Sequence, residues 1–192
     1  MVGRRLEEMW NLMDKYSLTI VGYGAGSGIL CFDILNYLKN NKALYGHLKY
    51  FIVKKREVMK KGQQKLLDEK VEWIKSIGEI KEIKGCVISN EVVDNFVVKR
   101  VVMKDELMEV FVDYQDGFVG DLLLASEKTK YYLQPHCVTL LKEYCAEINL
   151  EVEKWIREIA INIERCFTIT IDYGYSAYEL YAPNLNRGTL TC

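Results

Sequence analysis

The sequence predicts an α/β fold in which a mostly parallel sheet is flanked by helices, all within one domain over residues 1–192. Short apolar runs alternate with stretches of helical periodicity, a pattern typical of a parallel sheet. A glycine-rich loop joins the first apolar run to the helix that follows it. The 192 residues suffice for one well-buried core and are too few for two ordinary domains, and no repeat or linker marks a boundary.

The elements of this sheet follow one another in the first half of the chain. An amphipathic helix is expected first, because Leu6, Trp10 and Met13 recur at helical spacing and need a surface to cover. The remaining predicted elements are a strand at 18–21, a glycine loop at 22–28, a helix from 29 to 38, a strand at 50–53, a helix at 57–67, and short strands at 71–74 and 86–88.

A β-hairpin is predicted in the middle of the chain. Apolar and polar residues alternate at 97–103 and again at 108–114, with a polar stretch between them. We therefore expect an insertion of about residues 97–114 on the edge or rim of the sheet, followed by a second turn at Asp116 and Gly117.

The segment after the hairpin predicts a capped helix and a final strand. Asn149 is suited to capping a helix, because its side-chain oxygen can accept from a free N–H of the first turn. The apolar stripe of this helix would run from Val152 through Ile156 to Ile163. A strand at 167–171 follows directly.

Composition excludes several classes of partner. The chain has 26 basic and 27 acidic residues, so its net charge of -1 gives no general attraction for nucleic acid or anionic lipid. No stretch reaches the roughly 18 uncharged apolar residues of a membrane-spanning helix. The six cysteines form no C-x-x-C pair and there are two histidines, so no structural metal is expected. We expect a cytoplasmic protein with neither nucleic-acid nor membrane partners.

The glycine loop is the main candidate for a binding site. Glycines permit positive φ and let backbone N–H groups at a helix N-terminus approach a ligand closely. A dinucleotide fingerprint starting at Gly24 would need a glycine at position 29, which is Ile29. The spacing of Gly24, Gly26 and Gly28 is instead typical of methyltransferases. The alternative is a turn that only connects strand and helix.

Three segments of the chain resemble the MidA-like family of S-adenosylmethionine-dependent methyltransferases, relatives of the mitochondrial complex I assembly arginine methyltransferase. The segments are Ile20–Leu35, Val87–Arg100 and Thr168–Leu190, and they occur in the order in which the family has them. The resemblance implies a Rossmann-like methyltransferase fold and transfer of a methyl group from S-adenosylmethionine, with a protein as the acceptor.

The resemblance also implies roles for particular residues. Glu91 and Asp94 would be the catalytic pair, because a carboxylate can hold a guanidinium by two parallel hydrogen bonds. Glu91 and Asp94 would lie in a cleft at the edge of the sheet, and Asp172 would end a strand beside that cleft. The cofactor would be bound at Gly24, Ala25, Gly26, Gly28, Lys54 and Asn90.

The chain departs from the family pattern at two acidic positions. Gly22 stands where the family has a glutamate ahead of the glycine loop, and Lys54 replaces the glutamate that accepts the ribose hydroxyls. A lysine has donors and no acceptor, so Lys54 cannot take over that contact. The resemblance therefore implies a truncated member with an altered cofactor site, because family members also extend beyond both ends of this sequence.

Three other functions remain open on the sequence. A binding protein that keeps the fold without catalysis is one, favoured by Gly22 and Lys54. A binder of phosphate-bearing nucleotides is another, because residues 54–56 are Lys-Lys-Arg at the end of a predicted strand, although a solvated helix face is the preferred explanation of these residues. Nucleophilic chemistry is the third, with Lys99 or the neighbours His136 and Cys137 as candidates.

Overall fold

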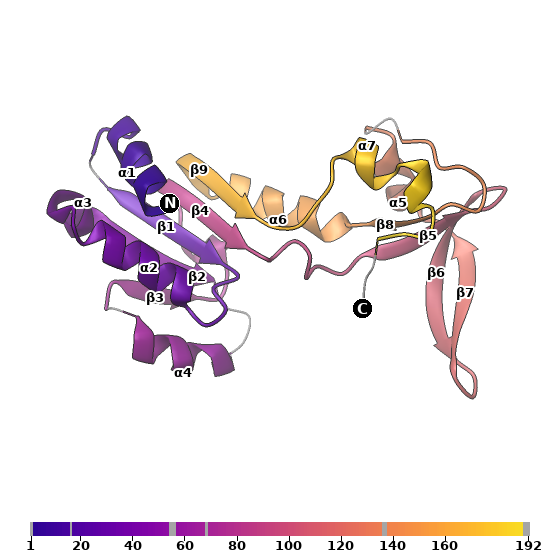
Figure 1. Ribbon diagram of the computed structural model, residues 1–192, viewed down its shortest axis with the longest axis horizontal. Coiled ribbons are helices and arrows are strands. Elements are labelled where there is room, and N and C mark those ends of the chain that lie inside the picture. Colours follow the sequence, from indigo (N-terminus) through magenta and orange to yellow (C-terminus); the bar gives the residue numbers. More distant parts are fainter. Residues whose placement is uncertain (1, 16, 54–56, 68, 136–137, 190–192) are drawn as a thin grey trace. The chain divides into compact units, whose positions relative to one another are not determined.

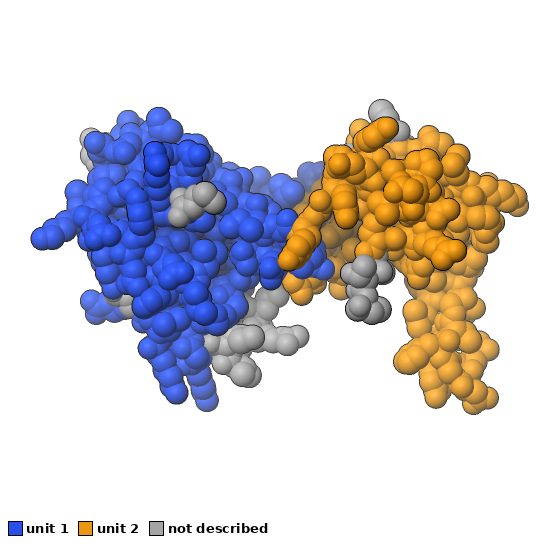
Figure 2. All heavy atoms as spheres, viewed as in Figure 1, with its two compact units in different colours: residues 1–94, 156–172 blue, residues 95–155, 173–192 orange. Residues whose placement is uncertain are grey.

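The computed structural model describes residues 2–15, 17–53, 57–67, 69–135 and 138–189. Its contacts group the chain into two compact units (Figure 2). Unit 1 comprises residues 1–94 and 156–172, and unit 2 comprises residues 95–155 and 173–192. The single domain expected over residues 1–192 stays a prediction beside this grouping, and each unit is described by itself.

Unit 1 is built on a five-stranded parallel sheet with the strand order β3-β2-β1-β4-β9 (Figure 1). The chain moves outward from β1 to β2 and β3 on one side, then returns to place β4 and β9 on the other. The order therefore reverses between β1 and β4, where ligands bind in open α/β sheets. The strands are β1 Leu18–Tyr23, β2 Leu48–Val53, β3 Val71–Ile74, β4 Ile83–Asn90 and β9 Ile163–Ile171.

Helices cover the sheet of unit 1 and confirm the predicted α/β class. The expected N-terminal helix is present, and its Leu6 and Trp10 are buried in the same apolar cluster as Ile20, Leu35 and Ile52. Apolar burial of this kind supplies most of the stabilisation that holds a helix on a sheet. The helices are α1 Val2–Leu12, α2 Ile29–Leu38, α3 Lys42–His47 and α4 Glu57–Leu66, with a 3-10 turn η1 at Ile77–Glu79.

The helix before β9 differs in part from its prediction. It is α6, Leu150–Ala160, and Asn149 caps it as expected by accepting from the N–H of Val152 at 3.1 Å. The predicted apolar stripe was too long, because Ile163 is the first residue of β9 and Ile156 is 54% exposed. β-branched residues at 163, 169 and 171 favour extension of the strand over continuation of the helix.

Unit 2 contains a separate antiparallel sheet with the strand order β7-β6-β5-β8. The predicted hairpin is present, because β5 pairs with β6 in antiparallel register. Its expected place was wrong: the described strands join it to β7 and β8 and not to the edge of the parallel sheet. The strands are β5 Lys99–Met103, β6 Leu107–Tyr114, β7 Phe118–Leu124 and β8 Cys145–Ile148.

This second sheet has an apolar core of its own, which explains why the hairpin does not need the parallel sheet. Val101, Leu107 and Ile148 are buried together with Leu133 of α5, the helix that follows the hairpin. The helical segments of unit 2 are α5 Glu127–Leu133, α7 Ala177–Leu180 and the 3-10 turn η2 Pro183–Leu185, besides the first part of α6. None of the described helices is long and apolar enough to cross a bilayer.

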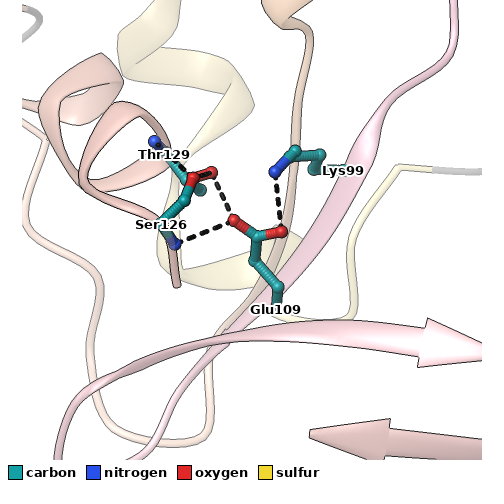
Figure 3. A network of polar contacts seen from close by, with 4 residues as sticks. All are labelled: Lys99, Glu109, Ser126 and Thr129. Atoms are coloured by element: carbon teal, nitrogen blue, oxygen red, sulfur yellow. Dashed lines mark hydrogen bonds and ion pairs between the residues drawn. The ribbon is translucent and has the colours of Figure 1, made fainter. Parts of the chain in front are cut away.

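A charged network ties the sheet of unit 2 to α5 (Figure 3). Glu109 is 4% exposed and accepts from Lys99 Nζ at 2.7 Å, from the backbone N–H of Ser126 at 3.0 Å and from the hydroxyl of Thr129. Burial by itself would raise the pKa of Glu109, but these hydrogen bonds outweigh it and lower the pKa to about 2. Lys99, a candidate nucleophile on the sequence, is engaged in this ion pair.

Candidate functional site

The glycine loop lies between the end of β1 and the start of α2, as predicted. Gly28 stands immediately before α2 with a φ of 91°, and its N–H donates to the carbonyl of Ala25 at 2.7 Å. Gly28 offers no side-chain cap, so the N–H groups of the first turn of α2 face the loop. Such N–H groups carry partial positive charge and bind anionic ligand groups.

Gly24 lets the loop approach the end of β4. Its φ is 66°, and a side-chain carbon there would overlap the backbone oxygen of Asn90 and lie 2.5 Å from Cγ2 of Val92. Only glycine combines this backbone conformation with so close an approach. The contact brings the β1–α2 loop and the end of β4 together at the point where the strand order reverses.

A pocket of about 400 Å³ lies at this point. Gly26 has a φ of 50°, and a side-chain carbon there would meet no described atom within 4 Å. The volume is within the range of pockets that hold small ligands and cofactors. Among the described residues it is lined by Gly24, Ala25, Gly26, Ser27, Ile29, Leu30, Asn90 and Glu91.

Asp172 fixes the loop that forms the other wall of this pocket. Its Oδ2 accepts from the backbone N–H groups of Val92 at 2.9 Å and Val93 at 2.7 Å. Glu91 has a φ of 47°, a conformation uncommon outside glycine, and its N–H donates to the carbonyl of Ile171 at 2.9 Å. The end of β9 therefore holds Glu91 in a left-handed conformation that costs about 1–2 kcal/mol.

Gln63 supports the glycine loop from α4, a role that the sequence did not indicate. Its side-chain amide donates to the carbonyl of Gly26 at 2.9 Å and its oxygen accepts from Trp73 Nε1 at 2.7 Å. Gln63 is 4% exposed although it lies on a lysine-rich helix. Neither its residue type nor its spacing separates it from the exposed Gln64, so only the fold reveals it.

The position of Gly22 is occupied from the neighbouring strand. A side-chain carbon at Gly22 would lie 3.2 Å from both Cε1 and Oη of Tyr50. Tyr50 is 3% exposed, and burial raises the pKa of its hydroxyl well above the usual value. A glutamate at position 22 therefore has no room unless the ring of Tyr50 moves.

The predicted site residues divide into three groups. Five of them line the one pocket: Gly24, Ala25, Gly26, Asn90 and Glu91. Gly28 is buried at the start of α2 and does not line it, and Asp94 is exposed and outside the lining. Lys54 lies outside the described residues, as do Lys55, Arg56, His136 and Cys137. The roles given to these residues stay predictions.

Two cysteines of unit 1 are core residues. Cys31 and Cys86 are buried, and burial raises the pKa of each thiol to about 12. A thiol with so high a pKa holds almost no thiolate at neutral pH. Neither residue is disposed to nucleophilic chemistry.

Comparisons with known proteins agree with this fold. Residues 1–192 match the family described as "Putative S-adenosyl-L-methionine-dependent methyltransferase". A Burkholderia thailandensis protein crystallised with S-adenosyl-homocysteine is similar to this chain, with a TM-score of 0.85, 21% identity, and coverage of 98% of this chain and 49% of that one. No curated protein matches the sequence.

A second crystal structure from the same organism, of an uncharacterized protein of the same superfamily, has a TM-score of 0.85 and 20% identity, covering 98% of this chain and 51% of that one. The chain thus spans about half the length of these two structures. At such identities the structural similarity shows the fold alone. The match over residues 1–192 shows that the chain belongs to this family of S-adenosyl-L-methionine-dependent methyltransferases.

Proposed function

We propose that the chain binds S-adenosylmethionine in the pocket beside Gly24–Ser27 and takes part in methyl transfer to a protein, with an arginine side chain as the acceptor. The observation that carries this proposal is the meeting of the glycine loop and the end of β4 where the strand order reverses. The similar Burkholderia thailandensis protein was crystallised with S-adenosyl-homocysteine, the product of such a transfer.

The residues present fit the amino-acid end of this cofactor. The N–H groups of the first turn of α2 would donate hydrogen bonds to its carboxylate, and the open space at Gly26 admits it to the loop. Asn90 also lines this pocket, where its side-chain amide oxygen would meet the positively charged groups of the cofactor. When bound, the cofactor supplies a methyl group that is already activated by its sulfonium.

The protein's part in the reaction is to orient the acceptor. Glu91 and Asp94 would hold a guanidinium by paired hydrogen bonds, which fixes the direction from which its nitrogen approaches. Orientation of this kind supplies a large share of rate acceleration when the donor is already reactive. The Glu91 carboxylate would also stabilise the positive charge of the substrate within the pocket.

Isothermal titration calorimetry with S-adenosylmethionine and S-adenosyl-homocysteine tests the proposal. Ser27→Trp fills the pocket from an exposed position, and we expect it to abolish binding. Ser17→Trp, also at an exposed serine but away from the pocket, is the matched control and should bind like the unaltered chain. Equal affinity of both variants would refute the placement of the site.

The second candidate function is a binding protein on the same scaffold without methyl transfer. The observation that favours it is Tyr50 beside Gly22, because a side chain at position 22 would require the ring of Tyr50 to move by a few tenths of an ångström. Losing one charge-assisted hydrogen bond of about 1.5–3 kcal/mol weakens affinity roughly 10- to 150-fold. An unaltered chain that binds neither ligand at millimolar concentration would refute methyl transfer and support this candidate.

A further inference from the structure

The outer part of the β6–β7 hairpin is a two-stranded arm. β6 pairs with β7 from Met108 to Tyr114, but its pairing with β5 reaches only from Leu107 to Glu109. Among the described residues, no third strand pairs with 110–122, which we call the arm. Figure 1 shows β6 and β7 continuing together beyond the shorter β5. Such a two-stranded hairpin is at best marginally stable in water without a surface to pack on.

The register of this hairpin sorts its side chains into two unlike faces, because residues directly opposite one another share a face. One face consists of the pairs Met108–Leu124, Val110–Leu122, Val112–Gly120 and Tyr114–Phe118. The other consists of the pairs Glu109–Leu123, Phe111–Asp121 and Asp113–Val119. Every pair of the second face contains a carboxylate, whereas the first, which we call the apolar face, contains no charge.

The apolar face is open to solvent. Phe118 is 85% exposed, Val112 73%, Tyr114 69% and Leu124 57%. The rings of Tyr114 and Phe118 pack edge to face with centroids 5.7 Å apart, so they form one continuous surface. An antiparallel sheet that faces water normally carries polar side chains there, so this face is suited to being covered.

We propose that two copies of this chain pack their apolar faces together. At these exposures the face presents on the order of 650 Å² per copy, or ~1,300 Å² for a pair, which is within the range of stable specific interfaces. A two-fold axis sets each face against itself, and an uncharged face meets its own copy without repulsion. The exposed carboxylates of the other face, Asp113 and Asp121, would repel those of its own copy, so the charge pattern selects which face is paired.

Gly120 adds shape to this self-recognition. It has no side chain, and it lies on the apolar face directly opposite Val112. The resulting depression between Phe118 and Leu122 can receive the Val112 side chain of the second copy. The inference concerns unit 2 alone and does not depend on methyl transfer.

Sedimentation velocity on the whole chain tests the proposal at ~50 μM, a concentration at which an interface of this size should be populated. We expect about twice the 22.3 kDa mass of one chain. Val112→Lys places a charge at the centre of the face and should raise the dissociation constant on the order of 100-fold or more, leaving a monomer. Leu123→Lys, on the same hairpin but on the other face, should remain a dimer.

Circular dichroism verifies that each variant is folded, and Phe118→Ser, near the turn, replaces Val112→Lys if that variant is not. A monomeric unaltered chain would overturn the proposal. So would a dimer that survives Val112→Lys, or one that Leu123→Lys dissociates equally, because the contact would then lie on another surface or another partner would cover the apolar face.

Discussion

Unit 2 should lose stability in acid because of one carboxylate, Glu109. Its pKa is lowered from 4.5 to about 2, and its side chain is only 6% exposed, so solvent screens its hydrogen bonds little. A carboxylate whose pKa is lowered by folding stabilises the folded state at pH values above its pKa in the unfolded chain. The contribution, about 3 kcal/mol, is complete above about pH 5 and is lost as the pH falls from 4.5 toward 2.

The assay is urea unfolding at several pH values between about 7 and 2.5, followed by tryptophan fluorescence and circular dichroism. Other carboxylates also titrate in this range, so the quantity that matters is the difference between the unaltered chain and Glu109→Gln. The variant keeps the size of the side chain but cannot ionise. We expect it to be about 2–3 kcal/mol less stable at pH 7, with the difference falling to below about 1 kcal/mol at pH 2.5. A difference that does not change with pH would refute the reasoning.

Three further changes test the site and the core. Gln63→Leu leaves two polar groups unpaired, including the half-buried Trp73 indole, and should cost about 1–3 kcal/mol in urea unfolding. Asp172→Ala removes the acceptor of two backbone N–H groups and should weaken S-adenosyl-homocysteine binding about tenfold in calorimetry. Cys31 and Cys86 should react with a thiol reagent at pH 8 only after the chain is unfolded.

The first two of these changes have a control within the chain. Gln64→Leu alters the exposed neighbour of Gln63 on α4 and should leave stability nearly unchanged. Asp33→Ala removes an exposed carboxylate of α2 that does not line the pocket, so binding should not change. If both members of either pair behaved alike, the contact in question would not have the role assigned to it. Rapid labelling of the folded chain at both buried thiols would contradict their burial.

The sequence predicted those elements of the fold that depend mainly on residues adjacent in the chain. The run of apolar residues in β1, the glycines after it and the periodicity of α2 are adjacent in sequence, so each is recognisable without its partners. The capping of α6 by Asn149 was predictable for the same reason. The glycine loop and the end of β4 were both recognisable from their residue types. Five of the predicted site residues lie in these two segments and line the same pocket.

Contacts between distant residues were beyond this kind of prediction. Asp172 reaches a loop 80 residues earlier, and β5 pairs with β8 across some 40 residues of chain. The hairpin pattern is the same whether it joins the edge of one sheet or starts another. What decides is a core built from Val101, Leu107 and Ile148, whose shared burial no single segment of sequence reveals.

Gly22 shows how a departure from a family pattern gains meaning from the fold. In sequence it is a missing carboxylate, which suggests that a glutamate could simply be put back. In the structure this space is filled by Tyr50, whose Cε1 atom lies 3.2 Å from the position that a Cβ atom at residue 22 would take. Position 22 and position 50 have therefore to be considered as a pair, since a glutamate would need both room and a partner for its charge in a buried place. The chain has no charge at this position, so among the described residues the groups that can bind an S-adenosylmethionine-like ligand are those of the glycine loop, the N-terminus of α2 and the end of β4.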